Sequence, residues 1–543
     1  MGQKAGEKWA AAVVSQPTIP KSDRLLAAWH LVPGVAPASL PMKMPARMPA
    51  LQECLVAVVF FFSAASAHAD LPPPVAQALA QAGIPDTHVA AVVHDLDAAE
   101  PLLLHGGARS LNPASVMKLV TTLAVLDSFG PAHTFKTRVL LDGTLKDGIL
   151  DGRLILQGGG DPALTPERFW LLLREIRARG VREIRGEVVL DGSFYRLDPI
   201  DPAAFDQAPL RPYNAPPAAL LANFNTVSLM LASDGTTVSA RFDPPLEAPS
   251  LSNQLVPGDG ACQALREQML LEPGKLTVNG RYPLSCGDQA IALNLLPPEA
   301  TTAAWFKQIW GELGGKLSGN LAGNLSAGVM AGEVGNPVPP TARFLLEFDS
   351  PPVAQLVRDT NKFSNNVMAK MLLLNLGAAR YGAPATWDKG VRALRAWLAE
   401  HDLECGKLVL ENGAGLSRIE RISAASLARL LRWATRQPAW FEFAASLPAV
   451  GLEGTQKHRL NGSAAQGQAW LKSGSLNGVR NLAGYARTPD GHRRVVVFLI
   501  NHPNAEAGGP AQDALVEWAT DTLGERGGEA GSEAAKSIGK AAN

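Results

Sequence analysis

Ser115 and Lys118 are the two residues whose types and spacing first suggest chemistry. They lie in the stretch LNPASVMK, where Asn112 suits the residue that caps a helix and Pro113 suits the first helical turn. Residues three apart on a helix share a face. A serine hydroxyl becomes a nucleophile when a base takes its proton, and a lysine amine can be that base if burial or a second cation lowers its pKa. A lone Ser-x-x-Lys pair is common by chance, so other residues must support this interpretation.

Two further stretches hold polar residues that would complete such a site. In TNKFSNNVMAK, Ser364 and Asn366 precede an apolar helical run and offer a hydroxyl and an amide to a proton relay and a substrate carbonyl. In AWLKSGSLNG, Lys472 and Ser473 stand in an extended run, and Gly474 would let a substrate backbone approach the strand. Taken alone, the first stretch could serve only to cap a helix, and the second could be a strand that carries a surface lysine.

The two ends of the chain predict one shared sheet. Short strands are expected near Val89 to Asp95 and Pro101 to His105, before the helix that starts at Asn112. Near the other end, NLAGYARTPDGHRRVVVFLINHP predicts two strands around a Pro-Asp-Gly turn, and GPAQDALVEWATDTLG predicts a terminal helix. Strands flanked by helices at both ends suggest that both ends build the same sheet.

The middle of the chain has a different character. From about residue 138 to 340, apolar and polar residues alternate between Asp-Gly and Gly-Gly turns, which predicts meandering antiparallel strands in one or two inserted modules. Helical periodicity returns from Phe344 to Leu431. The residues after Gly524 are rich in Gly, Ala, Glu and Ser, a composition typical of disorder.

An export signal is predicted near the start of the chain. Between Met42 and Ala69, basic residues give way to an apolar stretch and then to small residues, with a cut expected after Ala69. The apolar stretch is far shorter than the ~20 residues that span a bilayer, which disfavours a membrane anchor. In the oxidising compartment that export implies, Cys262 and Cys286 are expected to pair and Cys405 to be the odd thiol. The alternative for the first two is separate burial as thiols.

Composition and motifs argue against several classes of function. The chain has 543 residues, too many for one compact core, and 50 basic residues balance 50 acidic ones. Because the net charge is zero, the protein as a whole has no electrostatic field that would attract nucleic acid. There is no His-Glu-x-x-His, Gly-x-Ser-x-Gly or phosphate-loop pattern, so zinc peptidase, α/β-hydrolase and nucleotide-binding interpretations lose support. No metal or cofactor is implied.

Together and in this order, the three stretches resemble the Ser-x-x-Lys, Ser-x-Asn and Lys-Thr/Ser-Gly motifs of penicillin-binding proteins and β-lactamases. The chain is similar to the D-alanyl-D-alanine carboxypeptidase/endopeptidase family typified by penicillin-binding protein 4, peptidase family S13. That family shares the long insertion between the first two motifs, here about 245 residues. It also shares the stretches GGGDPALT, YNAPPAALLANFN, ENGAGLSR and GLEGTQKHR. The resemblance covers Leu71 to about Leu523.

The resemblance implies a catalytic role for four residues. Ser115 is expected to be the acylated nucleophile and Lys118 its general base. Ser364 is expected to pass a proton towards the leaving amine, while Asn366 holds the amide on the acyl side of the substrate.

The third motif implies the substrate-binding residues. Lys472 and Ser473 are expected to bind the terminal carboxylate of the substrate, beside Gly474. The backbone N–H groups of Ser115 and Ser475 are expected to form an oxyanion hole, in which each donor is typically worth roughly 3 to 4 kcal/mol. Serine at position 473 stands where the family often has threonine, and it keeps the hydroxyl.

The implied fold class is α/β (α+β). It is the penicillin-recognising fold of β-lactamases and transpeptidases, an antiparallel sheet flanked by helices, here with inserted β-rich domains. The expected domains are an N-terminal extension and signal at 1–69, a catalytic domain from 70–137 plus 340–524, a β-rich insertion at 138–339 whose second subdomain spans about 232–312, and a disordered tail at 525–543.

The resemblance implies a periplasmic serine peptidase that cleaves D-Ala-D-Ala termini or cross-links of peptidoglycan and binds β-lactams without a cofactor. No nucleic-acid partner and no transmembrane anchor after signal cleavage are expected, and homo-oligomerisation stays open. Two alternatives remain. A serine β-lactamase would share the motifs but has no use for the long insertion. A non-catalytic peptidoglycan-binding module would lack a catalytic group, whereas here all three motifs are intact.

Overall fold

The computed structural model describes residues 70–324, 338–403 and 406–522. The predicted signal segment that ends at Ala69, the thiol of Cys405 and the predicted tail at 525–543 lie outside these residues. Within the described ranges, no helix combines the length and the apolar character needed to cross a membrane.

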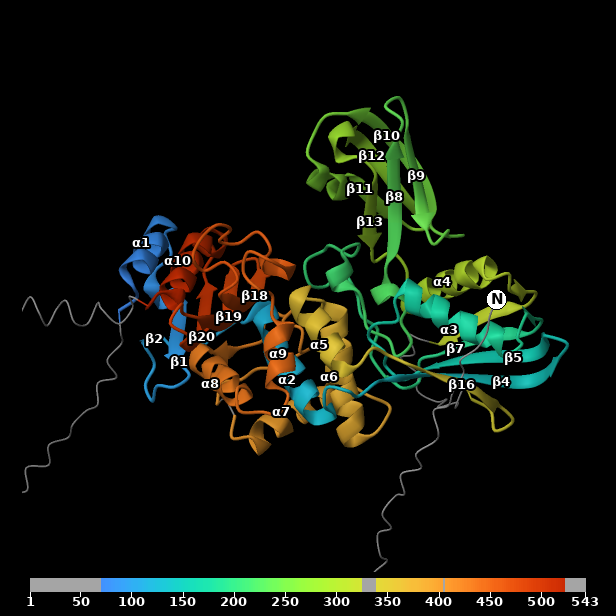
Figure 1. The fold of residues 1–543 in the computed structure, drawn as a ribbon. Helices are drawn as coiled ribbons and strands as arrows, with labels where there is room; N and C mark the ends of the chain where they lie inside the picture. The colour runs from blue at the N-terminus through green and yellow to red at the C-terminus, as the bar shows by residue number, and fades with distance from the viewer. Residues whose placement is uncertain (1–69, 325–337, 404–405, 523–543) are drawn as a thin grey trace, which may run out of the picture. The chain divides into compact units, whose positions relative to one another are not determined.

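A five-stranded antiparallel sheet joins segments from near the two ends of the chain (Figure 1). Strand β1 pairs with β20 along its whole length, from Val89 opposite Ile500 to Asp95 opposite Arg494. This pairing confirms that the two ends build one sheet. The strands, in their order across the sheet, are β18 (Ala469–Leu476), β19 (Val479–Arg487), β20 (Arg493–Asn501), β1 (Val89–Asp95) and β2 (Leu103–His105).

Helices cover both faces of this central sheet (Figure 1). Strand β20 is buried from Arg494 to Ile500 because both of its faces pack against helices. The continuous apolar run from Val495 to Ile500 is typical of a strand that is covered on both faces. One face packs against α1 (Pro73–Gln81) and α10 (Gly509–Thr520). The other face packs into a core that holds α2 (Lys118–Phe129), α5 (Val353–Lys362), α6 (Asn366–Tyr381), α7 (Trp387–Glu400), α8 (Ala424–Ala434) and α9 (Trp440–Ser446).

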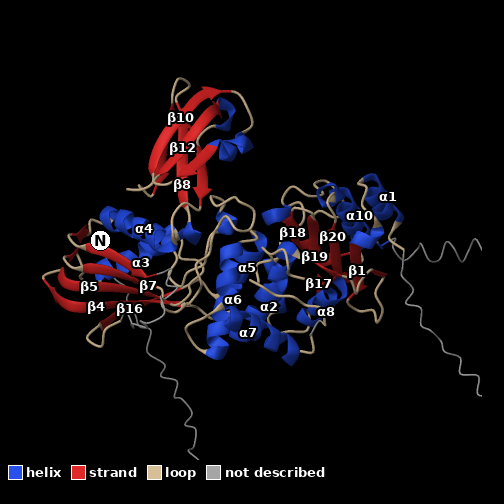
Figure 2. Ribbon diagram, turned by 180° about the vertical axis from the view of Figure 1, so that it is seen from behind, coloured by secondary structure: helices blue, strands red, loops and turns tan. Residues whose placement is uncertain are grey.

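A larger inserted sheet follows α2 in the chain (Figure 2). Its order is β14-β6-β5-β4-β16, with β7 paired to β5 and β15 paired to β7. Helices α3 (Pro166–Ala178) and α4 (Pro298–Glu312) share its hydrophobic core. The strands are β4 (Lys136–Lys146), β5 (Ile149–Gly158), β6 (Glu183–Ile184), β7 (Glu187–Asp191), β14 (Lys316–Leu317), β15 (Asn320–Asn324) and β16 (Arg343–Asp349).

Two predictions about this region are wrong in part. Strands β4 and β5 are antiparallel, as the turns predict, but β6 and β7 run parallel to β5 because helix α3 crosses over between them. Residues 344–349, predicted to be helical, form strand β16 and pair with β4. Their side chains alternate from Leu346 onwards, with Leu346 and Phe348 buried and Glu347 and Asp349 exposed, which is the period of a strand.

Two three-stranded sheets form a smaller inserted unit around a separate hydrophobic cluster. A disulfide joins Cys262 to Cys286 within it. Helix α4, which falls inside the predicted second subdomain at about 232–312, instead buries Trp305 and Phe306 in the core of the larger sheet. The strands are β8 (Val227–Ser233), β9 (Val238–Asp243) and β13 (Gln289–Leu293) in one sheet, and β10 (Ser250–Gly258), β11 (Met269–Glu272) and β12 (Lys275–Pro283) in the other.

Candidate active site

Ser115 lies in a 3₁₀ turn, Ala114–Met117, that leads directly into α2. The Asn112 side chain accepts a hydrogen bond from the N–H of Ala114 at 2.8 Å, an Asx turn that leads the chain into this 3₁₀ turn. The carbonyl of Asn112 in turn accepts a hydrogen bond from the Asn481 side chain on β19 at 2.9 Å. The turn that carries the serine is therefore fixed by the central sheet.

Lys118 and Ser115 contact each other, with 2.9 Å between Nζ and Oγ. The same Nζ donates to the side-chain oxygen of Asn366 at 2.6 Å and to the backbone oxygen of Ala414 at 2.5 Å. The structure thus brings the first motif and the second motif together at one amine.

The environment of Lys118 favours the neutral amine. Its side chain has no exposed surface. Burial is the largest cause that lowers the pKa of Lys118 well below its usual value, and the nearby cations Lys472 and Lys370 lower it further, while Glu420 opposes them. Repulsion between lysines is therefore one cause, but burial is the larger one. A neutral amine this close to a hydroxyl can accept its proton.

The second motif forms the start of α6. Ser364 precedes the helix with φ of 55°, a left-handed conformation that is uncommon for serine. The Asn365 side chain caps the helix by accepting a backbone N–H three residues later at 3.0 Å. Asn366 accepts from Lys118 through Oδ1 and donates through Nδ2 to the backbone oxygen of Tyr213 at 3.0 Å. Both ends of the amide are engaged, so its orientation is fixed.

Strand β18, at the edge of the central sheet, carries the third motif. Lys472 is fully buried and donates through Nζ to Ser364 Oγ at 2.8 Å and to the backbone oxygen of Ser473 at 2.7 Å. Burial lowers the pKa of Lys472 to about 7. The Ser473 hydroxyl donates to Thr455 Oγ1 at 3.2 Å, and Ser475 is exposed. The second and third motifs therefore meet at the contact between Ser364 and Lys472.

Gly474 lies against the turn that carries Ser115. A Cβ added at this position would lie 2.6 Å from the carbonyl oxygen of Pro113 and 3.0 Å from the backbone nitrogens of Ser115 and Val116. The approach of a substrate backbone to this glycine stays a prediction. Its missing side chain lets β18 approach the serine turn.

Gly474→Ala should separate β18 from the serine turn and slow acylation. The new methyl group would meet backbone atoms, which cannot rotate away, so the two motifs must move apart. We expect acylation by a fluorescent penicillin to slow by about 100-fold, because small misplacements of reacting groups have effects of this size. Gly311→Ala is the matched control, since a Cβ there would have no neighbour within 4 Å. If Gly474→Ala is acylated at the wild-type rate, the close approach of β18 to the serine turn does not contribute to acylation.

Two contributors to the cluster lie in stretches that carry the family resemblance, but the sequence interpretation gave neither residue a role in the site. Ala414 and Tyr213 act through backbone carbonyls, so their side chains carried no signal. The glycines around Ala414 were the available signal, because a Cβ at Gly415 would lie 1.8 Å from the carbonyl oxygen of Ala114. That close approach brings the segment up to the serine turn.

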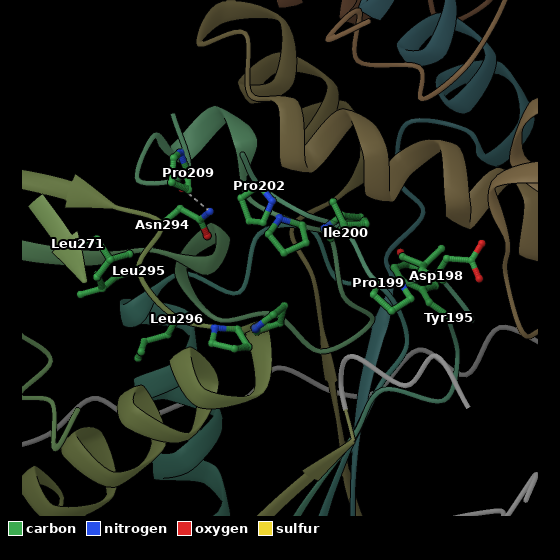
Figure 3. A pocket seen from close by; sticks show the side chains of 15 residues that line it. Tyr195, Asp198, Pro199, Ile200, Pro202, Pro209, Leu271, Asn294, Leu295 and Leu296 are labelled. Atoms are coloured by element: carbon green, nitrogen blue, oxygen red, sulfur yellow. Dashed lines mark hydrogen bonds between the residues drawn. The ribbon is translucent and has the colours of Figure 1, made fainter. Parts of the chain in front are cut away.

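Two other features of the described residues lie apart from this cluster. Asp95, Asp97 and His492 bring three potential ligand atoms within 4.8 Å of one another, but none of them belongs to the three motifs. A cavity of about 440 Å³ is lined largely by proline and leucine side chains, and no residue of the three motifs lines it (Figure 3). Tyr195, which lines this cavity, donates through its hydroxyl to the Asn375 side chain on α6 at 2.6 Å.

Known proteins resemble the chain over most of its length. It is 28% identical over 465 residues to a D-alanyl-D-alanine carboxypeptidase from Actinomadura sp. (strain R39), covering 82% of each chain. It is 24% identical over 405 residues to the D-alanyl-D-alanine carboxypeptidase DacB from Haemophilus influenzae, covering 73% of this chain and 82% of that one.

The fold matches a solved structure as well. The crystal structure of penicillin binding protein 4 (dacB) from Haemophilus influenzae aligns with a TM-score of 0.66 at 22% identity, covering 82% of this chain and 99% of that chain. This likeness confirms the predicted penicillin-recognising fold. The family match extends over residues 72–522, from the start of α1 to the end of the described chain, and it shows that the protein belongs to the D-Ala-D-Ala carboxypeptidase 3 (S13) family.

Proposed function

We propose that this protein hydrolyses the terminal D-Ala-D-Ala bond of peptidoglycan stem peptides through an acyl-enzyme on Ser115. The observation that carries the proposal is the fully buried Lys118, whose Nζ lies 2.9 Å from Ser115 Oγ and whose pKa is lowered well below its usual value. The relatives named above are D-alanyl-D-alanine carboxypeptidases, and this supports the same reaction.

In the acylation step, Ser115 Oγ bonds to the carbonyl carbon of the penultimate D-Ala while its proton passes to Lys118 Nζ. The backbone N–H groups of Ser115 and Ser475 would stabilise the oxyanion. The C–N bond then breaks, and the leaving amine of the terminal D-Ala takes up a proton through the Ser364 hydroxyl. The contact between Ser364 and Lys472 supports that route, because an ammonium beside the hydroxyl can replace the proton it gives away.

Deacylation would use the same base. After acylation, the proton that Lys118 took from Ser115 passes to Lys472, which restores both the neutral Lys118 amine and the Lys472 ammonium. Water then attacks the ester carbonyl of the acyl-enzyme while Lys118 takes a proton from the water, and Lys118 returns that proton to Ser115 Oγ as the ester bond breaks. Asn366 would hold the amide on the acyl side, and its fixed orientation supports that assignment. The products are the shortened peptide and free D-alanine.

Lys472 and Ser473 would bind the terminal carboxylate of the substrate, and this gives a pH prediction. Because burial lowers the pKa of Lys472 to about 7, its ammonium is lost from the free enzyme as the pH rises through about 7. We therefore expect kcat/KM for a peptide with a free carboxylate to fall above pH 7, by about tenfold per pH unit at the steepest. The matched C-terminal amide should fall less steeply, because it loses only the proton supply through Ser364 and not the binding of a carboxylate. Equal pH profiles for the two peptides would argue against carboxylate binding by Lys472.

We also propose that the protein cleaves cross-links from D-Ala to diaminopimelate, and that it acts in the periplasm. A cross-link presents the same acyl group with a larger leaving amine, so the same steps apply. The signal pattern before Ala69 supports export, and the substrate lies outside the cytoplasm.

The activity test uses the mature protein with a D-Ala-D-Ala peptide, a cross-linked muropeptide dimer and penicillin. Release of D-Ala from the first substrate supports carboxypeptidase activity, and conversion of the dimer to monomers supports endopeptidase activity. Penicillin should form one long-lived adduct per protein molecule. Rapid turnover of penicillin without D-Ala release would favour the β-lactamase alternative, and no reaction with any of the three would favour a non-catalytic binding module.

A further inference from the structure

Glu420 is a buried carboxylate that no step of the proposed mechanism uses. Its side chain has no exposed surface. One oxygen, Oε1, accepts hydrogen bonds from three consecutive backbone N–H groups, those of Glu411, Asn412 and Gly413, at 2.9, 3.1 and 3.3 Å. The other oxygen, Oε2, has no hydrogen-bond partner among the described residues. Three converging N–H groups form a strong site for a negative charge, so this carboxylate holds the start of the 411–415 segment in place.

The 411–415 segment touches the proposed catalytic pair directly. The carbonyl of Ala414 accepts a hydrogen bond from Lys118 Nζ at 2.5 Å, and the carbonyl of Gly413 accepts one from the Thr121 hydroxyl, one turn further along α2, at 2.7 Å. Gly415 lies so close to the serine turn that a Cβ would collide with it. A shift of this segment would therefore move the acceptor that orients Lys118.

The other end of the same loop is tied to the serine turn as well. The Ser417 hydroxyl accepts the backbone N–H of Glu420 at 3.0 Å, and the Ser417 carbonyl accepts the Asn112 side chain at 2.8 Å. Two residues after Glu420, the short strand β17 (Ile422–Ser423) begins, and it pairs with β3 (Ser110–Leu111), which precedes Asn112. Glu420 thus stands at the centre of a loop that is fastened to the serine turn on both sides.

The charge of Glu420 acts on Lys118 in the opposite sense to its other neighbours. Lys370 from α6 and Lys472 from β18 lower the pKa of Lys118, and Glu420 from the loop raises it. Burial raises the pKa of Glu420 itself, as does the charge of Glu411, whereas the three N–H groups lower it. An amine whose pKa is lowered too far binds a proton only weakly. The negative charge of Glu420 therefore keeps the Lys118 amine basic enough to take a proton.

We infer that Glu420 is a positioning residue for acylation: its carboxylate holds the 411–415 segment against the Ser115–Lys118 pair and supplies the negative charge that balances the lysines around it. This inference rests on the proposed function of that pair. It assigns no contact between Glu420 and the substrate.

The test separates the charge of Glu420 from its hydrogen bonds. Glu420→Gln keeps an acceptor oxygen for the three N–H groups and removes the charge, while Glu420→Asp keeps the charge on a shorter side chain. Glu411→Gln is the matched control, because it removes an exposed negative charge from the same loop. The pKa of Lys118 is followed by NMR of protein labelled with [ε-¹³C]lysine, with Lys118→Arg used to assign the signal. The acylation rate with a fluorescent penicillin and the melting temperature are measured on the same samples.

We expect the pKa of Lys118 to be lower in Glu420→Gln than in the wild type by about one unit, the size typical of losing a nearby opposite charge. Acylation should slow in parallel at an unchanged melting temperature, and Glu420→Asp should recover part of the rate. Glu411→Gln should leave both quantities as in the wild type. An unchanged Lys118 pKa in Glu420→Gln would overturn the inference, as would a slower rate explained by a lower melting temperature alone. If the wild type itself forms no adduct on Ser115, the proposed function fails instead, and the two failures are thereby distinguished.

Discussion

Replacing Lys118 with methionine should slow acylation by a fluorescent penicillin by about 10³-fold, the loss expected when a general base is removed. Methionine keeps the length and apolar stem of the side chain but cannot take a proton from Ser115 Oγ. It also leaves the Asn366 side-chain oxygen and the Ala414 carbonyl without the donor that they share. Single-turnover labelling measures the rate, and circular dichroism at rising temperature shows whether the fold persists.

Lys118→Arg decides what the amine contributes. Arginine places a permanent positive charge at this position, because its guanidinium stays protonated at every relevant pH. If Lys118 acts as a base, the arginine variant should be as slow as the methionine variant. If Lys118 acts instead as a fixed cation that attracts the substrate, the arginine variant should keep much of the wild-type rate, and the assignment of Lys118 as the base would be wrong.

The local part of the site could be predicted from the sequence, because it depends on spacing within one turn. Ser115 and Lys118 are three residues apart, and Asn112 and Pro113 indicate where the turn begins. The contact between Lys118 and Asn366 joins residues 248 positions apart. Spacing carries no information about such a contact, so only the resemblance to a family pointed to it.

The burial and the hydrogen bonds of Glu420 could not be predicted from the sequence. A glutamate between an isoleucine and an arginine in a loop reads as a solvated surface charge. Its burial and its three N–H donors arise from the path of the backbone at 411–413, which is set by tertiary packing. Gly474 was recognised as a place where a substrate could approach the strand, and the structure adds that the serine turn also lies against it.

The fold was predictable where strands are bounded by strong turns and hydrophobic runs. Strands β1 and β20 follow their sequence patterns closely. Residues 344–349 were misassigned because an alternating run of only a few residues precedes long helices whose periodicity dominates the segment. The direction of β6 and β7 relative to β5 depends on the crossover by α3, and turn signals do not report it.

Ser115→Ala should abolish covalent labelling by penicillin and release of D-Ala, because the oxygen that forms the ester is gone. Ser364→Ala is the matched control, since Ser364 is a second serine hydroxyl of the cluster, in contact with Lys472. It should still be labelled, at a slower rate, because it loses the proposed proton relay but keeps the nucleophile. Thermal denaturation of both variants shows whether either loss is due to unfolding.

The site of the penicillin adduct tests the role of Ser115 directly, and intact mass measurement followed by peptide mapping of the digested protein locates it. We expect one adduct per wild-type molecule, located on Ser115, and none on Ser115→Ala. If the adduct lies on any other residue, or persists in Ser115→Ala, Ser115 is not the nucleophile.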